Sequence, residues 1–392
     1  MSQAGRLNVV VVSTEAPDPF GNAIGRWHYV LAKGLCDRGH RVRWLAACND
    51  EIHARRANAL FAGSPLDLRL YPYATRNSLV RKLKTIRRPY SYLFAGRLEH
   101  DLRSELKKGY DVLDLEHTWT GWLGIGVPRT LLSVLALAKI DLPPTVSSSL
   151  KGAVAGVLMR RTERHLISHF NNIRVLTSRD ARVVEGLNHE ARITTIPLAL
   201  DTSLYPFSVE GPATETVGLI GSMDWQPTRS AAIRLLTSIW PRVRAKKRGA
   251  KLLIVGWRAR KSLARFLDMP DVTVLEDVPV SEPFFRKLSV LAYPAIAASG
   301  MQVKVLEAMA YGVPIVTTSE GIEGIDAVDG IHAFITDEDE SLADRIASLL
   351  GADETGLEMR IAARRLLEDR YSPGPIVSQI EDLYHEISEA GD

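Results

Sequence analysis

The feature that most constrains the fold of this chain is a segment of order strand, loop, helix and strand that occurs twice. Leu7–Val12 is rich in β-branched residues, which is typical of a strand buried in a parallel sheet. A loop with two prolines and a glycine, Ser13–Asn22, follows it. Apolar residues then recur at helical spacing, at Ile24, Trp27, Leu31 and Leu35. Val42–Ala46 predicts the next strand, which completes a βαβ unit.

The same order restarts at residue 217. Val217–Ile220 predicts a strand and Gly221–Gln226 a loop, and Pro227 suits the first turn of a helix. Lys251–Val255 predicts the strand after that helix. Further short strands are expected at Asp111–Leu115, Arg174–Ser178, Val272–Leu275, Leu288–Ala292 and Val313–Thr317. Two tandem, Rossmann-like, doubly wound α/β domains therefore account for the whole chain.

Proline and glycine between residues 201 and 214 mark the expected domain boundary. We expect an N-terminal domain over residues 1–205 and a C-terminal domain over residues 206–374. A last helix, 375–392, carries apolar residues along one face and is expected to dock back toward the N-terminal domain. Because parallel sheets bind ligands outside the carboxyl ends of their strands, two such domains facing each other would enclose a cleft.

Composition excludes several classes of protein. Two cysteines in 392 residues exclude a disulfide framework, and the longest apolar runs fall short of the roughly 20 residues of a membrane-spanning helix. We find no signal peptide and no nucleic-acid recognition module, and we expect a cytoplasmic protein. The net charge of +3 is unevenly divided. Residues 1–205 carry 29 Lys and Arg against 18 Asp and Glu, whereas residues 206–392 carry 20 against 28.

The most informative segment for function is Pro294–Thr317. It predicts a strand end, a loop of small residues, and a helix from about Met301 that ends at Gly312. The N–H groups of Ser299–Gln302 and the positive end of the helix dipole would favour an anion. Lys304 in the first turn suits a phosphate, and Glu307 one turn later suits a ribose diol. The alternative is that this lysine and this glutamate only pair with each other on a solvated helix.

The segment Lys304–Ala310 followed by Gly312 and Pro314–Val316 resembles the donor motif of retaining GT-B glycosyltransferases of family four, the glycosyl transferases group one. Further segments resemble other parts of that family in the same order: Arg38–Val42, Asp111–His117, Ile193–Pro197 with Leu200 and Asp201, and Val217–Trp225. The resemblance spans residues 7–387. It implies the GT-B fold, a nucleotide-sugar donor in the C-terminal domain and an acceptor mainly in the N-terminal domain.

The resemblance also implies roles for individual residues. Glu307 would bind the ribose, Lys304 would neutralise the departing diphosphate, and Gly221 would let the backbone approach the phosphates. His117 would lie near the scissile bond and, with Glu307, would be catalytic. The donor nucleotide and diphosphate site would comprise Gly221, Ser222, Arg229, Lys304, Val305, Leu306 and Glu307. The acceptor and phosphate loop of the first domain would contain Gly21 and Asn22.

The chain departs from the family pattern at two positions. Ser299 stands where many members have a second glutamate, so the donor sugar would be held by Ser299, Gly300, Met301 and Gln302, mainly through backbone amides. Ser222 stands where many members have arginine. Arg229, Arg258 or Lys261 could supply that charge, and the sequence does not choose among them.

The mechanism that the resemblance implies retains the configuration of the sugar and requires neither a cofactor nor a metal. Bases and the helix terminus would stabilise the departing diphosphate in place of a metal ion. Asp337, Glu338 and Asp339 contain an Asp-x-Asp pattern, but we expect these three acids to cap the helix that ends at Leu350. The enzyme would move a hexose from a UDP- or GDP-sugar in bacterial polysaccharide or glycoconjugate biosynthesis. The alternatives are a nucleotide-sugar epimerase and a non-catalytic nucleotide-sugar-binding protein.

A basic stretch in the N-terminal domain suggests a second kind of partner. No acid lies between Asp67 and Glu99, and five bases fall within eight residues, at Arg81, Lys82, Lys84, Arg87 and Arg88. A basic helix with apolar neighbours can lie on an anionic membrane. The interpretation is peripheral contact of the region Arg81–Arg88 with the inner face of the plasma membrane, where a lipid-linked or glycan acceptor would lie. The alternative is a solvated helix face.

Overall fold

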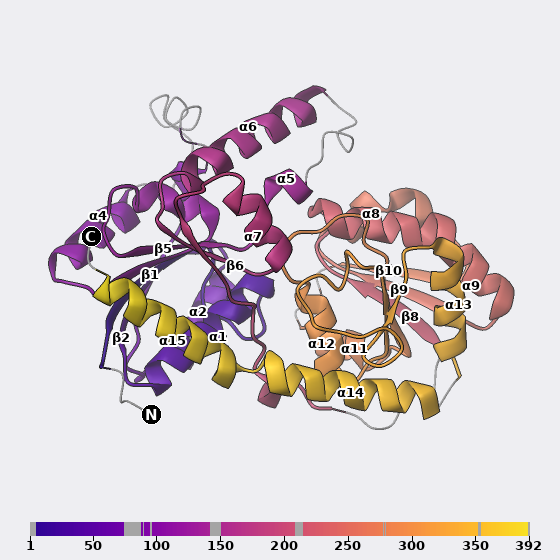
Figure 1. Cartoon of the computed structure of the whole chain (residues 1–392). Helices are drawn as coiled ribbons and strands as arrows, with labels where there is room; N and C mark the ends of the chain where they lie inside the picture. Colours follow the sequence, from indigo (N-terminus) through magenta and orange to yellow (C-terminus); the bar gives the residue numbers. More distant parts are fainter. Residues whose placement is uncertain are drawn as a thin grey trace. The chain divides into compact units, whose positions relative to one another are not determined.

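Two parallel sheets with helices against their faces organise the chain (Figure 1). The computed structural model describes residues 5–73, 88, 90–94, 96–141, 150–207, 215–276, 278, 280–351 and 354–390. The chain divides into an N-terminal unit, made of Met1–Ala199 with Pro373–Asp392, and a C-terminal unit, Leu200–Ser372. The last helix therefore belongs to the N-terminal unit.

The N-terminal unit contains a seven-stranded parallel sheet of order β3-β2-β1-β4-β5-β6-β7. Its strands are β1 (Asn8–Ser13), β2 (Arg41–Ala47), β3 (Asp67–Tyr71), β4 (Val112–Glu116), β5 (Thr130–Val134), β6 (Asn172–Val175) and β7 (Arg192–Thr195). Its α-helices are α1 (Ala23–Asp37), α2 (Glu51–Leu60), α4 (Arg97–Lys107), α5 (Ala138–Asp141), α6 (Leu150–Ile167), α7 (Ser178–Glu185) and α15 (Pro373–Glu389). The strand order reverses between β1 and β4, which is the topological switch point of this sheet.

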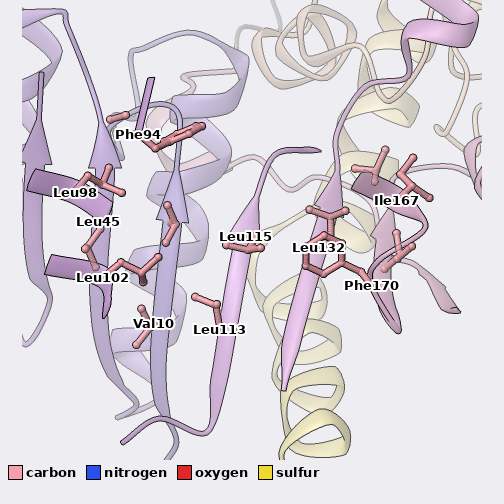
Figure 2. Close-up of a cluster of buried hydrophobic side chains, with 14 of the residues drawn as sticks. Val10, Leu45, Phe94, Leu98, Leu102, Leu113, Leu115, Leu132, Ile167 and Phe170 are labelled. Atoms are coloured by element: carbon pink, nitrogen blue, oxygen red, sulfur yellow. The ribbon is translucent and has the colours of Figure 1, made fainter. Parts of the chain in front are cut away.

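The two faces of this sheet differ in chemistry. One face is an aliphatic and aromatic core in which side chains from alternate strand positions, such as Leu113 and Leu115, pack against residues of α4 and α6 (Figure 2). The intervening positions of β4, Asp114 and Glu116, are also fully buried but point to the other face, since successive side chains of a strand alternate. Helices α1 and α15 pack on that side.

The last helix is held to the N-terminal unit by polar contacts. Glu381 of α15 accepts a hydrogen bond from His40 at 2.9 Å and forms an ion pair with Arg38 at 3.2 Å. The hydroxyl of Tyr384 donates to Asp114 on β4. The apolar stripe of the helix, including Ile376 and Ile380, is buried. This helix is thus part of the layer that covers the polar face of the first sheet.

The C-terminal unit contains a six-stranded parallel sheet of order β10-β9-β8-β11-β12-β13, which repeats the order of the first six strands of the other sheet. Its strands are β8 (Thr216–Ile220), β9 (Lys251–Val255), β10 (Val272–Leu275), β11 (Val290–Tyr293), β12 (Ile315–Thr317) and β13 (Phe334–Ile335). Its α-helices are α8 (Gln226–Arg234), α9 (Trp240–Lys246), α10 (Ala259–Ser262), α11 (Glu282–Phe285), α12 (Val303–Tyr311), α13 (Asp339–Leu349) and α14 (Glu354–Arg370). Here the order reverses between β8 and β11.

The predicted fold class of two doubly wound α/β units is confirmed. Gly312 ends helix α12 in the left-handed conformation, as its position after the apolar helix predicted. The sequence pattern did not predict strands β3, β5 and β13. The strand expected over residues 174–178 ends earlier, since β6 stops at Val175 and α7 begins at Ser178. Thr177 caps α7 by accepting the N–H of Asp180.

Candidate functional site

The candidate donor site lies at the switch point of the C-terminal sheet. The loop after β8 holds Gly221 and Ser222, and the loop after β11 leads through Ser299 to α12, which carries Lys304 and Glu307. Because β8 and β11 are neighbours and parallel, both loops leave the same edge of the sheet. The structure therefore brings the loop with Gly221 and the predicted donor helix together.

Lys304 is the residue on which the two loops converge. Its ammonium donates to Oε1 of Gln302 at 2.9 Å and lies 4.0 Å from the centroid of the Tyr293 ring. The hydroxyl of Tyr293 donates to the same Gln302 oxygen at 3.0 Å. Tyr293 ends β11 and is fully buried, so a rigid strand end and the first residues of α12 fix the lysine head group.

This environment changes the acidity of the lysine. Burial lowers the pKa of the Lys304 ammonium to about 7, and the negative charge of Glu307 acts in the opposite direction. A lysine that has lost hydration gains most from an incoming anion, because the anion replaces the solvation that the protein removed. The ammonium of Lys304 donates to a neutral amide oxygen, that of Gln302, and a phosphate oxygen could take the place of this acceptor.

Two glycines allow this arrangement. Gly221 has φ +145°, and a Cβ there would lie 3.2 Å from Cε of Lys304 and 3.1 Å from a methyl of Thr228. A Cβ on Gly256, at the end of β9, would lie 1.8 Å from the carbonyl oxygen of Gly221. Gly256 directly follows the predicted strand Lys251–Val255, and the position of the Gly221 backbone depends on it, although the family motifs did not indicate it.

Glu307 lies one turn after Lys304 on α12 and is buried. Its Oε1 accepts a hydrogen bond from the hydroxyl of Ser281, which precedes α11. The hydrogen bond fixes the carboxylate between α12 and the segment that follows β10. Ser281 was not predicted, because a serine 26 positions away in sequence carries no local signal.

The loop before α12 places the predicted sugar-binding residues close to this lysine. Ser299, Met301 and Gln302 are buried, and Gly300 has φ +64°. Gln302 is the N-cap residue of α12 and makes no side-chain capping hydrogen bond. Val305 and Leu306 have fully buried side chains, and their N–H groups donate to the carbonyl of Gln302, so neither residue offers a free group to the site.

The three bases that could replace an arginine at position 222, namely Arg229, Arg258 and Lys261, differ in what they contact. Ser222 itself is exposed. Arg229 donates a hydrogen bond to Gln226 within its own helix. Arg258 instead forms an ion pair of 3.1 Å with Asp224 in the loop between β8 and α8. Lys261 is exposed on α10. Of these bases, Arg258 is the one whose guanidinium contacts the loop between β8 and α8.

His117 follows β4 at the switch point of the N-terminal sheet. Its Nδ1 accepts the backbone N–H of Trp119 at 3.2 Å, so the neutral ring carries its proton on Nε2. Burial, with a smaller contribution from the neighbouring His28, lowers the pKa of His117 to about 4, although the charge of Glu116 acts in the opposite direction. The residue has φ +150° and stacks on Trp119, which stacks in turn on Tyr90.

The loop that follows β1 lies at the same switch point. Gly21 is buried, and Asn22 caps α1 by accepting the N–H of Gly25 at 2.8 Å. Asp18 organises this loop: it is buried, its carbonyl accepts the N–H of Gly21, and its carboxylate binds Arg56 at 3.0 Å. His53 contacts the same carboxylate at 2.5 Å. No sequence pattern indicated this partnership between the first loop and α2.

A buried polar cluster lies directly beneath His117. Glu116 accepts hydrogen bonds from Trp27 at 2.8 Å and from Arg174 and Ser133 at 3.2 Å. Burial alone would raise the pKa of Glu116, but His28 and Arg174 outweigh it, and the pKa is lowered. The pKa of Asp114 is raised by burial and by the charge of Glu116. The cluster thus holds one ion pair and one carboxyl group that favours its protonated form.

The Asp-x-Asp pattern is not assembled as a metal site. Asp337 accepts hydrogen bonds from the backbone and hydroxyl of Ser319, and Asp339 forms an ion pair of 2.7 Å with Arg234. Of the three acids expected to cap this helix, Glu338 is its N-cap residue, but its side chain makes no capping hydrogen bond. Among the described residues, no group of three or more His, Cys, Asp and Glu side chains could hold a metal ion.

The basic cluster lies mostly outside the described residues. Arg81, Lys82, Lys84 and Arg87 are among the residues that the structure does not describe. Arg88 is described and exposed, and its guanidinium lies 5.5 Å from the centroid of the Trp122 ring. The expected membrane contact of this cluster therefore stays a prediction.

Comparison with solved structures shows the same fold along nearly the whole chain. Anabaena Alr3699/HepE in complex with UDP and glucose is 13% identical, with a TM-score of 0.68, and the match covers 97% of this chain and 100% of that one. Sucrose-phosphate synthase from Thermosynechococcus elongatus is 15% identical, with a TM-score of 0.72 and coverages of 98% and 100%. A point mutant of S. aureus TarM in complex with fondaparinux, alpha-GlcNAc-glycerol and UDP is 12% identical, with a TM-score of 0.71 and coverages of 96% and 100%.

Two tandem doubly wound units make up the GT-B fold, which the chain shares with these solved structures. Residues 214–352 match the family model described as "Glycosyl transferases group 1". This match lies within the C-terminal unit, covers about a third of the chain, and agrees there with the family resemblance that the motifs indicated. No curated protein matches the chain in sequence.

Proposed function

We propose that the chain is a retaining, metal-independent hexosyltransferase that uses a UDP- or GDP-sugar. Its acceptor would be a glycan, a lipid-linked molecule or a small molecule in bacterial polysaccharide or glycoconjugate biosynthesis. The observation that carries the proposal is the convergence of Lys304, Gly221 and Glu307 at one sheet edge. This is the edge at which doubly wound sheets bind nucleotides.

In this proposal the C-terminal unit binds the donor. Lys304 exchanges Gln302 for a diphosphate oxygen, and Gly221 lets the backbone of the loop approach the same group. Glu307, held by Ser281, accepts hydrogen bonds from the ribose hydroxyls. The segment Ser299–Gln302 holds the sugar. The positive end of the α12 dipole adds to the attraction for the diphosphate.

The N-terminal unit contributes His117 and the loop with Gly21 and Asn22. Because His117 is neutral and keeps its proton on Nε2, it is suited to donate a hydrogen bond to a sugar hydroxyl rather than to supply a positive charge. The acceptor would bind mainly along this unit.

The chemical step breaks the bond between the anomeric carbon and the diphosphate oxygen as the acceptor oxygen attacks from the same face. The electron pair leaves with the diphosphate, which takes up the acceptor proton. Lys304 and the α12 terminus stabilise the charge that develops on the leaving group, as a metal ion would in other enzymes.

The relatives suggest which donor to test first. The HepE structure contains UDP and glucose, and the TarM structure contains UDP. We therefore expect UDP to raise the melting temperature more than GDP or ADP. The Lys304→Ala and Glu307→Ala variants should each bind the preferred nucleotide about 10- to 150-fold more weakly, because each loses a charge-assisted hydrogen bond.

Matched controls are available in the same unit. Lys246 and Glu282 form ion pairs on the surface of helices, and their alanine variants should bind nucleotide as the wild type does. Product analysis with the best donor then tests turnover. Unchanged affinity in both site variants would refute the donor site. Conversion of the sugar without an acceptor would indicate an epimerase, and binding without turnover would indicate a non-catalytic protein.

A further inference from the structure

Helix α6 presents an exposed apolar surface that the glycosyltransferase reaction does not use. Val154, Val157 and Leu158 are 61%, 58% and 43% exposed. Their spacing places them on one side of the helix. Among the described residues, no other helix exposes three large apolar side chains. Such a group of side chains, left in water, marks a surface that meets an apolar partner.

The C-terminal half of the same helix is firmly attached to the N-terminal unit. Leu166 and Ile167 are fully buried, and Ile167 is part of the core shown in Figure 2. Glu163 is buried and accepts the N–H of Ala138 at 2.9 Å, which connects α6 to α5. Helix α6 lies on the outside of this unit in Figure 1. The exposed apolar segment is therefore held rigidly by its own helix.

The charged residues on the exposed side of α6 indicate which kind of partner binds there. Arg161, Arg164 and His165 are exposed and lie on the same side of α6 as the apolar residues, one to three turns further along the helix. Glu163 is the helix's one acidic residue, and it points into the protein. His165 also contacts the Trp122 ring over which Arg88 lies. The exposed side of the helix thus carries apolar side chains, two arginines and no exposed acid.

We propose that this side of α6, from Val154 to His165, docks onto an anionic lipid bilayer. The apolar end would enter the boundary between head groups and acyl chains, and Arg161 and Arg164 would contact the lipid phosphates. No helix among the described residues is long and apolar enough to span a bilayer. The contact that we propose is made by one side of α6 at the bilayer surface. The proposal stands on this surface alone and does not depend on the donor site.

A second copy of the chain fits this surface less well than lipid does. In a symmetric dimer the helix would meet the same helix of the other copy, which offers no exposed acid to pair with its arginines, whereas anionic head groups supply that charge at every position. The 18 residues of α6 make it about 27 Å long, so its apolar residues and its arginines can reach a bilayer surface together.

Sedimentation with vesicles tests the proposal. The full chain should bind vesicles of phosphatidylcholine and phosphatidylglycerol at low salt, bind pure phosphatidylcholine much less, and lose binding in high salt. Replacing Val154, Val157 and Leu158 together by Ser should lower binding about tenfold or more, because exposed apolar surface no longer enters the lipid. Replacing Arg161 and Arg164 by Gln should lower it about fivefold per residue.

The matched control replaces Ile52 and Leu60 by Ser. These residues are exposed on α2 of the same unit, and their loss should leave vesicle binding unchanged. The altered side chains are exposed in large part, so the variants should fold and bind the donor as the wild type does. Leu158 and Leu60 are partly covered, and their replacement should lower the melting temperature by only a few degrees. A fluorescent label at position 157 should shift its emission to shorter wavelength when anionic vesicles are added.

Three results would overturn the proposal. The first is a wild-type protein that ignores anionic vesicles at low salt. The second is a serine variant that binds them as well as the wild type, which would assign any membrane contact to the separate cluster Arg81–Arg88. The third is a dimer in solution that the serine variant abolishes, since that would assign the surface to a second copy of the chain.

Discussion

Lys304 makes nucleotide binding depend on pH in a direction that follows from the structure. In the free protein its pKa is about 7, because burial removes hydration from the ammonium. A bound diphosphate favours the charged form and must raise that pKa. Binding therefore takes up a proton above pH 7, and affinity falls as the pH rises through the range in which the free lysine is neutral.

The magnitude follows from the same value. With a pKa of about 7, the protonated fraction of free Lys304 is about a quarter at pH 7.5 and about 3% at pH 8.5. We therefore expect nucleoside diphosphate affinity to fall about eightfold between these two values. The second ionisation of a phosphate, with a pKa near 6, is nearly complete above pH 7.5 and contributes little. At pH 8 binding should take up about 0.9 proton.

Isothermal titration calorimetry measures both quantities. Titrations in two buffers of different ionisation enthalpy give the proton uptake, and a series from pH 7.5 to pH 8.5 gives the slope of affinity. The Lys304→Gln variant should bind weakly with almost no pH dependence. The Lys304→Arg variant keeps its charge at every pH, so its affinity should be nearly constant over the range.

Two outcomes would refute the reasoning. A wild type that binds nucleotide with constant affinity and takes up no proton would show that Lys304 does not titrate against the diphosphate. A pH slope that persists in Lys304→Gln would assign the titration to another group. The exposed Lys246, replaced by Gln, serves as the control for a general loss of positive charge and should leave the slope unchanged.

Three further predictions concern other parts of the molecule. Gly221→Ala should weaken nucleotide binding tenfold or more in calorimetry, because φ at this position is +145° and the new Cβ would lie 3.2 Å from Cε of Lys304. An affinity equal to that of the wild type would show that the loop adapts to the added methyl group. Arg174→Met should lower the free energy of unfolding in urea by about 3–5 kcal/mol, since it leaves Glu116 buried without its cation; a loss below about 1 kcal/mol would contradict this. Activity should survive excess chelator, and a loss restored by Mg²⁺ or Mn²⁺ would contradict the metal-independent mechanism.

Much of the fold could be predicted because it depends on local pattern. Strands such as β1 and β9 are rich in β-branched and aliphatic residues because both faces of a parallel sheet are covered. Strand β3 was missed because Asp67 and Arg69 alternate with leucine, as in an exposed edge strand. Strand β5 was missed because its apolar residues run on without interruption into the segment that follows.

The candidate site was predictable only where residues lie close together in sequence. Lys304 and Glu307 lie on one helix, so their spacing could suggest a shared ligand. Ser281 and Gly256 contribute through tertiary contacts, to Glu307 and Gly221, that no local pattern encodes. The lowered pKa of Lys304 could not be predicted either, because it results from burial.

The buried polar cluster around Glu116 shows why buried charged residues cannot be predicted from a sequence pattern and what they contribute to the structure. A charged residue inside an apolar run looks like an exposed position, yet Glu116 and Arg174 are both fully buried. Two isolated buried charges would be strongly destabilising, so each requires the other. Arg174 also donates to the carbonyls of Ile196 and Pro197, which connects the end of β4 to the segment after β7. Because His117 directly follows Glu116, this cluster fixes the backbone that carries the predicted catalytic imidazole.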